Sequence, residues 1–473
     1  MKSARLCLLV LTVYLPAMTF AATRDVGPGQ PYSTIQSCLN AAVAGDVCNV
    51  HAGTYNETLS LSSSGTSTAS ITLQANPGDI VNVQSSNAPV LNLNGKSYWS
   101  VNGLNFTYNG SGSNVSGIGT NSGSVNYITL SNNTVTLNGG GCSSSGGIAI
   151  PNADHLTVSG NTIKIFTTSG CDGAELLLNS NLQFTGNTIY GNADGTTGKL
   201  EDGMVVSGTN LNIENNVLHD GWSYNTHPDG IVVQGDGDRN GNLTANVKVW
   251  RNTVYNFTQG IYFDAIHNPL QGTNLVADNL IYEQSNFQYP TGTYNKMNCI
   301  VLDGENISGP GFPINVSVYN NTLDCHQLHV YVLRTSTGTA IDFKNNIFVN
   351  PPYGANYVSV TTGVTMDYDY YDQSSNPPIK WGGTAYSAAG FASAGLGESH
   401  ARSGSVGLNS DYTENANSNS VDHGFDLSTF FTIDKIGVSR PQGAAWDMGA
   451  FEYSGAGSPQ PPRPPTVGPP QIQ

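Results

Sequence analysis

An asparagine that returns about every 27 residues is the feature that most restricts the fold of this chain. It lies within short runs of alternating apolar residues, such as "TVSGNTIKI" and "DFKNNIFVN", and such alternation is typical of β-strands. The intervals between copies are 28, 28, 26, 29, 36, 27, 42 and 25 residues. The copies are Asn105, Asn133, Asn161, Asn187, Asn216, Asn252, Asn279, Asn321 and Asn346. A unit of this size cannot bury its own apolar face, so the repeat predicts stacked coils with a ladder of asparagine amides.

A second series of short strands lies between the asparagine segments. It runs "GGIAIP", "DGMVVSG", "DGIVVQG", "QGIYFDA" and "NCIVLDG", so each period holds at least two strands. Strong helix formers are few and charged residues make up only 11% of the chain, which also favours a β-rich fold. The predicted fold class is all-β, a parallel β-helix solenoid with coils of about 27 residues.

The chain resembles the secreted right-handed parallel β-helix proteins of the pectate-lyase-like superfamily. The resemblance rests on the repeat, on "GQPYSTIQSCLNAAVAGDVCNVHAGTYNE" near the start and on "RPQGAAWDMGAFEY" near the end. It covers residues 24 to about 453 and implies a right-handed coil. It says little about chemistry, because this fold carries lyases, hydrolases, epimerases and adhesins.

The two ends of the chain differ in composition from the repeat. Residues 1–21 combine a basic start, an apolar run and a small-residue cleavage site, which predict a signal peptide and an exported protein, extracellular or periplasmic. We expect the β-helix over 22–370, a capping region over 371–453 and a Pro-rich disordered tail over 454–473. No other segment is apolar and long enough to cross a bilayer.

Six cysteines remain once the predicted leader is removed. An even number in an exported protein favours disulfides, although six cysteines allow fifteen pairings. Sequential pairing would close short loops, and it joins Cys38 to Cys48, Cys142 to Cys171 and Cys299 to Cys325. No CxxC motif occurs, which argues against a cysteine zinc site.

Two aspartates occupy the same place in neighbouring strands of the second series. Asp202 opens "DGMVVSG" and Asp229 opens "DGIVVQG", 27 residues later. Stacked coils would hold their backbones about 4.8 Å apart. Two carboxylates so close repel, so that one takes up a proton or a cation lies between them. Asp-Gly is also common in turns, but Glu201 and His227 lie beside the pair and favour a functional site.

Further polar residues fall on the outward positions of the same strands. Strand alternation places Asp264 outward, next to Tyr262, whose ring could stack against a sugar. The predicted catalytic residues are Asp202, Asp229, His227 and Asp264. The predicted substrate-binding residues are Tyr262, Trp222, Asp303 and Gln234. The alternative is an ordinary polar outer face that includes a single tyrosine.

The stretch "DGDRNGN" matches the first half of an oxygen-rich calcium loop, D-x-[DN]-x-[DN]-G. The glutamate expected at the twelfth position is absent, since Val247 stands there, so another carboxylate is needed. The candidate calcium ligands are Asp236, Asp238, Asn240 and Glu201. The alternative is a solvated turn rich in Asp and Asn.

The formal charge of −16 disfavours nucleic acid and anionic membranes as partners. We expect a monomer that acts on an extracellular polysaccharide. The Asp-Asp, Gly-His-Gly and Arg-Ile-Lys motifs of polygalacturonases are absent. "EDGM" and "HPDGI" resemble the calcium-holding Asp-Gly pairs of family-nine pectate lyases, which gives a slight preference for a calcium-assisted polysaccharide lyase.

The lyase interpretation departs from that family in two places. Pro228 stands where the family has a second aspartate, and no lysine is clearly placed as the base, with Lys199 and Lys296 as candidates. A glycoside hydrolase that uses paired aspartates is the first alternative. A non-catalytic glycan-binding or surface β-helix is the second.

Overall fold

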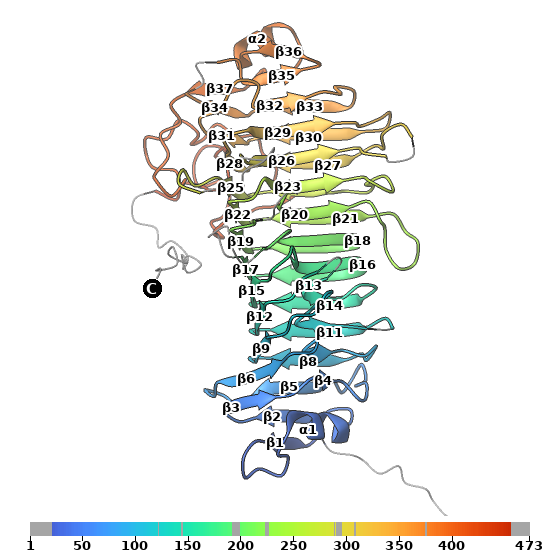
Figure 1. Cartoon of the computed structure of the whole chain (residues 1–473). Helices are drawn as coiled ribbons and strands as arrows, with labels where there is room; N and C mark the ends of the chain where they lie inside the picture. Colours follow the sequence, from blue (N-terminus) through green and yellow to red (C-terminus); the bar gives the residue numbers. More distant parts are fainter. Residues whose placement is uncertain are drawn as a thin grey trace, which may run out of the picture.

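The protein is a parallel β-solenoid, as the repeat predicts (Figure 1). The structure is a computed structural model that describes residues 21–121, 123–142, 145–191, 199–222, 227–287, 289, 296–306, 309–373 and 376–455. The predicted leader and the Pro-rich tail therefore fall almost wholly outside the described residues. The strands form three series, and strands of one series pair in parallel from coil to coil.

The first series carries the predicted site. Its strands are β4 (Leu59–Ser60), β7 (Leu91–Asn92), β10 (Ile118–Gly119), β13 (Gly146–Ala149), β20 (Asp229–Gln234), β23 (Gln259–Asp264), β26 (Asn298–Asp303), β29 (Leu328–Leu333), β32 (Asn356–Val358) and β35 (Ile379–Trp381). Two long strands, β16 (Asp172–Thr185) and β18 (Met204–Glu214), belong to both the first and the second series.

The second series precedes the asparagine positions. Its strands are β1 (Thr23–Val26), β2 (Val47–Val50), β5 (Ile71–Ala75), β8 (Trp99–Asn102), β11 (Asn126–Ser131), β14 (Asp154–Ser159), β21 (Ala245–Trp250), β24 (Leu275–Ala277), β27 (Asn315–Tyr319), β30 (Ala340–Lys344) and β33 (Val364–Asp367).

The third series follows the asparagines and forms a sheet of 13 strands. These are β3 (Gly53–Asn56), β6 (Val81–Ser85), β9 (Asn105–Tyr108), β12 (Thr134–Asn138), β15 (Thr162–Phe166), β17 (Thr188–Tyr190), β19 (Val217–His219), β22 (Thr253–Tyr255), β25 (Leu280–Tyr282), β28 (Thr322–Asp324), β31 (Ile347–Phe348), β34 (Tyr370–Asp372) and β37 (Arg402–Gly404). The remaining elements are α1 (Ile35–Ala41), α2 (Ala388–Ser393) and β36 (Thr384–Tyr386).

The asparagine ladder lies at the turn between the second and third series. Its members are Asn133, Asn161, Asn187, Asn216, Asn252, Asn279, Asn321 and Asn346. From Asn161 onward, each amide oxygen accepts the backbone N–H of the preceding member at 2.8–3.0 Å. The prediction was wrong for Asn105, which pairs with Thr134 and so lies one position late. Leu104 occupies the ladder position and donates its N–H to Asn133.

The glycines of the first series are required by packing. They form a column of Gly117, Gly147, Gly173, Gly203, Gly230 and Gly260. A Cβ at any of them would lie 2.2–2.7 Å from a core side chain of the third series. None has a positive φ, so the Asp-Gly pairs mark close approach of two sheets rather than turns that need glycine's conformational freedom.

The three disulfides join the cysteines in sequential order, as predicted. Cys38 is bonded to Cys48. Cys142 is bonded to Cys171. Cys299 is bonded to Cys325. Asn298 pairs with Gln259, so Cys299 occupies the position that Gly260 has on the preceding coil. The third disulfide therefore joins a first-series strand, β26, to the turn between β28 and β29.

The C-terminal segment folds back along the outside of the third series (Figure 1). Arg440 fastens it, because this fully buried guanidinium pairs with Asp278 at 2.9 Å and with Glu452 at 3.0 Å. Both partners are also buried, so the guanidinium has carboxyl partners on two sides within the interior. Among the described residues, no helix is long and apolar enough to cross a membrane.

Candidate active site

Three aspartates, rather than two, are stacked where strands of the first series begin. Ala174 pairs with Met204, which pairs with Ile231, so two residues earlier Asp172, Asp202 and Asp229 share one position on successive coils. We call these three residues the acid column. The backbone N–H of Asp229 donates to Oδ1 of Asp202 at 2.9 Å, which fixes one carboxyl beside the next.

The acid column holds carboxyl groups that cannot all be ionised. Burial and the charge of Asp229 raise the pKa of Asp202 well above its usual range. Burial, followed by the charges of Glu175 and Glu201, does the same for the pKa of Asp172. Burial also raises the pKa of Glu175. Close like charges in a poorly solvated place favour the neutral acid, so the surroundings of Asp202 favour its protonated form.

His227 neutralises the last member of the column. Its Nδ1 lies 3.0 Å from Oδ2 of Asp229, and that contact raises the pKa of His227 to about 9. Burial raises the pKa of Asp229 to about 6, against the opposing effect of the histidine. At neutral pH the two form an ion pair. Oδ1 of Asp229 is buried and accepts no hydrogen bond from the described residues.

An apolar strip runs beside the column on the outward positions of the same strands. It consists of Val205, Val232, Tyr262 and Val301, in register on four coils. Tyr262 is only 8% exposed, so it is not the open stacking platform that the sequence suggested. Its neighbours cover it, and its hydroxyl lies 3.4 Å from Asp303. Trp222 is likewise buried, at 8% exposure.

A second stacked carboxyl pair borders the strip on its other side. Gln234, Asp264 and Asp303 are in register. Arg334 donates to both oxygens of Asp303, from Nε at 2.8 Å and from its terminal nitrogen. Burial, and then the charge of Asp303, raises the pKa of Asp264 to about 7. Two stacked pairs, Asp202 with Asp229 and Asp264 with Asp303, are therefore alike. In each pair one carboxylate is ion-paired and the other carboxyl has a raised pKa.

The predicted calcium loop does not fit a cation. Asp238 accepts the backbone N–H groups of Asn240 and Asn242 and the hydroxyl of Thr209 at 2.8–3.0 Å, which closes the turn. Asp236 is bonded to His267. Glu201 is adjacent in sequence to Asp202, and its charge acts on Asp172 and Asp202 of the acid column. Over the described part of the chain, no group of three or more His, Cys, Asp and Glu side chains is arranged to hold a metal ion.

Sequence reasoning missed Asp172 and Arg334. "CDGAELL" carries the same Asp-Gly step as "EDGMVVS" and could have revealed Asp172, but its Glu175 interrupts the apolar pattern. Arg334 lies just after β29 and meets Asp303 only across coils, 31 residues apart. Among the described residues, no lysine forms an ion pair with a carboxyl of the acid column.

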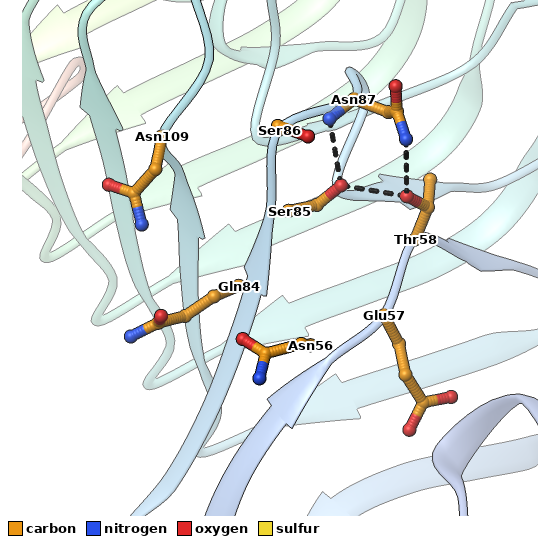
Figure 2. Close-up of a pocket in the computed structure, with 8 residues that line it drawn as sticks. All are labelled: Asn56, Glu57, Thr58, Gln84, Ser85, Ser86, Asn87 and Asn109. Atoms are coloured by element: carbon orange, nitrogen blue, oxygen red, sulfur yellow. Dashed lines mark hydrogen bonds between the residues drawn. The ribbon is translucent and has the colours of Figure 1, made fainter.

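A polar hollow of about 310 Å³ near the N-terminal end does not supply an alternative active site (Figure 2). Figure 2 shows Thr58, Ser85 and Asn87 bonded to one another. Glu57 is its one carboxylate, and both of its oxygens accept backbone N–H groups at the start of α1. A single carboxylate that caps a helix leaves no acid–base pair.

Comparisons with known proteins find similar structures but no matching sequence family. No family model and no curated protein matches the chain. A pectate lyase, Pel9A, matches 92% of this chain and 97% of its own at 14% identity and a TM-score of 0.45. An alginate lyase from Paenibacillus sp. str. FPU-7 matches 69% of this chain and 94% of its own at 14% identity and a TM-score of 0.35.

A GH136 lacto-N-biosidase from Eubacterium ramulus also matches. The match covers 74% of this chain and 64% of the biosidase at 12% identity and a TM-score of 0.44. These structures therefore comprise both lyases and a biosidase. At such low similarity, the function has to be argued from the site itself.

Proposed function

We propose that the protein is a carbohydrate-active enzyme that hydrolyses glycosidic bonds with Asp202 and Asp229. The observation that carries this proposal is the division of charge in the acid column. Asp202 is held neutral by burial and by the charge of Asp229, while His227 keeps Asp229 ionised. Glycoside hydrolysis needs such a pair, one carboxyl to donate a proton and one carboxylate to act on the sugar carbon.

The first step transfers the glycosyl group to Asp229. Asp202 gives its proton to the glycosidic oxygen as the bond between that oxygen and the anomeric carbon breaks. Oδ1 of Asp229 attacks the anomeric carbon and forms an ester, and the leaving saccharide departs as an alcohol. No described residue donates to Oδ1, and because this oxygen is buried, the substrate has to displace the groups that cover it.

The second step returns both carboxyls to their starting states. The ester removes the negative charge of Asp229, which was one cause of the raised pKa of Asp202. Asp202, now ionised, accepts a proton from water as that water attacks the anomeric carbon and displaces Asp229. The backbones of adjacent coils lie about 4.8 Å apart. We therefore expect the two carboxyls to be closer to the spacing of retaining than of inverting hydrolases.

The lyase that the sequence slightly favoured is less well supported. It needs a cation to neutralise a uronate and a base to remove its C5 proton. Two of the four side chains predicted to bind calcium, Asp236 and Asp238, already make hydrogen bonds within the protein. The surroundings of the column are strongly acidic, which disfavours an anionic substrate. A neutral polysaccharide is therefore the proposed substrate.

The test incubates the purified protein with neutral polysaccharides and with uronates, in calcium and in EDTA. Reducing ends, ultraviolet absorbance from unsaturated products and the anomeric configuration by proton NMR are followed together. We expect reducing ends from a neutral polysaccharide, no unsaturated product, no effect of EDTA and retained configuration. An unsaturated uronate product that EDTA abolishes would overturn the proposal and restore the lyase.

A non-catalytic glycan-binding role is the second candidate, and one observation favours it. The apolar strip and Asp229 are almost completely covered, with Asp229 only 2% exposed. If no polysaccharide is cleaved but one binds with an affinity that Asp202→Asn does not change, this second role replaces the first.

A further inference from the structure

A cavity of about 600 Å³ lies on the third series, away from the acid column. Its inner wall comes from β19, β22, β25 and β28, and its outer wall from residues 410–413, 435–436 and 451 of the C-terminal segment. Figure 1 shows this segment beside those strands. The cavity shares no residue with the acid column, and its size is in the range of small-molecule sites.

A row of stacked rings fixes the shape of the cavity. His219, Tyr255 and Tyr282 stack on successive coils at 4.8 and 4.9 Å. Tyr412 of the C-terminal segment continues the row at 5.4 Å from Tyr282. The ring faces cover one another, so the tyrosines present their edges to a ligand. Tyr412 also donates its hydroxyl to Asp324 at 2.8 Å, which locks the outer wall to the solenoid.

Acceptors stand at one end of the cavity. The carboxylate of Glu283 accepts the backbone N–H of Met297 at 3.0 Å and pairs with His326 at 3.1 Å. Asp324 lies on the next coil, in register with Tyr282. These contacts hold two carboxyl groups rigidly, and each keeps acceptor capacity for a further donor.

A buried donor stands elsewhere in the lining. Arg251 packs on Trp250 and pairs with Glu214, but its Nε is buried and finds no acceptor among the described residues. Lys435 donates to the carbonyl of Arg251 at 2.8 Å and packs beside it. A buried donor without a partner is costly, so a ligand that offers an acceptor there would be favoured.

We propose that this cavity is a binding site for a short neutral saccharide. Sugar hydroxyls both donate and accept, so one ligand can serve Glu283, Asp324 and Arg251. The C–H surfaces of a sugar suit the apolar lining from Leu280, Ile436 and Phe451. A wholly apolar ligand would leave the polar groups unpaired, and a uronate would bring its charge toward two carboxyls. The proposal does not depend on hydrolysis at the acid column.

The test blocks the cavity from its rim. Ser285→Trp and Ser410→Trp place a bulky ring at exposed turn positions that line the cavity. Ser67→Trp, at an exposed turn near the N-terminal end, is the matched control. Each change is made in the full chain that also carries Asp202→Asn, so that cleavage does not interfere. Cellotriose, xylotriose, maltotriose and trigalacturonate are titrated by calorimetry.

We expect at least one neutral trisaccharide to bind and both blocking variants to lower its association constant at least about tenfold. The control should bind as the parent does, and circular dichroism should show all variants folded. The proposal is overturned if no neutral trisaccharide binds, if trigalacturonate binds more tightly, or if the blocked variants bind normally. Hydrolysis without this binding would leave the proposed function standing, and binding without hydrolysis would leave this site standing.

Discussion

The asparagine ladder and the acid column are built in the same way and behave in opposite ways. In both, one residue type recurs at one position of successive coils. An asparagine amide donates and accepts, so Asn252 accepts from Asn216 and donates to Asn279. An ionised carboxylate only accepts, so Asp172, Asp202 and Asp229 can satisfy one another only by holding protons or by pairing with His227.

This difference shows what stacking does to a single residue choice. A neutral amide repeated along the axis becomes a continuous source of stability, because every buried polar atom finds a partner. A carboxyl repeated along the axis becomes a set of shifted pKa values, because each charge opposes the next. In this solenoid, the turn between the second and third series therefore contributes stability, whereas the start of the first-series strands carries groups suited to acid–base chemistry.

The largest expected effect comes from removing the acid at the centre of the column. Asp202→Asn keeps an oxygen for the N–H of Asp229 but cannot donate the required proton in the same way. We expect hydrolysis to slow about 10³-fold, the usual scale for a lost general acid, with no loss of thermal stability. Asp79→Asn, near the N-terminal end, is the control. A rate within about threefold of the parent would exclude Asp202 as the acid.

Breaking the ladder should affect stability rather than chemistry. Asn252→Ala leaves the backbone N–H of Asn216 and the carbonyl of Ile213 without their partners in the interior. We expect the free energy of unfolding in urea to fall by about 3 kcal/mol, with the hydrolytic rate per folded molecule unchanged. Asn138→Ala, at the exposed end of strand β12, should cost much less. Equal losses in the two variants would show that the ladder contributes no more than surface amides.

A smaller effect should follow from relieving charge in the column without removing the catalytic pair. The charge of Asp172 is one cause of the raised pKa of Asp202. Asp172→Asn should therefore move the alkaline limb of the pH–rate profile to lower pH. It should also raise the free energy of unfolding at pH 8 by about 1 kcal/mol, because one buried carboxyl no longer has to ionise. An unchanged alkaline limb would mean that Asp172 does not act on Asp202.

Much of the fold could be predicted from sequence because the period exposes the coil directly. The asparagines and the Asp-Gly steps recur at coil spacing, so residues such as Asp202 and Asp229 could be aligned without a structure. A period does not resolve a shift of one position, which is why Asn105 was misplaced.

The rest of the site depends on contacts that no local pattern records. Tyr262 is covered by side chains of neighbouring coils, so its burial could not be predicted from alternation alone. Arg334 meets Asp303 from the following coil and neutralises it. The turn that contains Asp238 matches a calcium-binding motif in sequence. In the structure, however, the Asp238 carboxylate accepts the backbone N–H groups of Asn240 and Asn242 from the same turn.

The smallest effect on stability is expected at Asp369, a buried carboxyl that stands at the end of the asparagine ladder. The ladder ends at Asp369, whose Oδ1 accepts the backbone N–H of Asn346 at 2.7 Å, in the place of the next asparagine. Glu398 lies against it and accepts the hydroxyl of Tyr371 at 2.6 Å. Burial, and then the charge of Glu398, raises the pKa of Asp369 well above its usual range. Burial raises the pKa of Glu398 to about 7.

Because both of these pKa values are raised on folding, the folded protein binds more protons than the unfolded chain above about pH 4. Stability should therefore fall as the pH rises toward and through 7. Asp369→Asn completes the ladder with an amide and removes one of the two titrating groups. We expect it to be near neutral at pH 5 and to raise the free energy of unfolding by about 0.5–1 kcal/mol at pH 8. Urea unfolding at both pH values measures this, with the exposed Asp426→Asn as control. An equal effect at pH 5 and pH 8 would mean that Asp369 acts as another ladder acceptor and not as a buried acid.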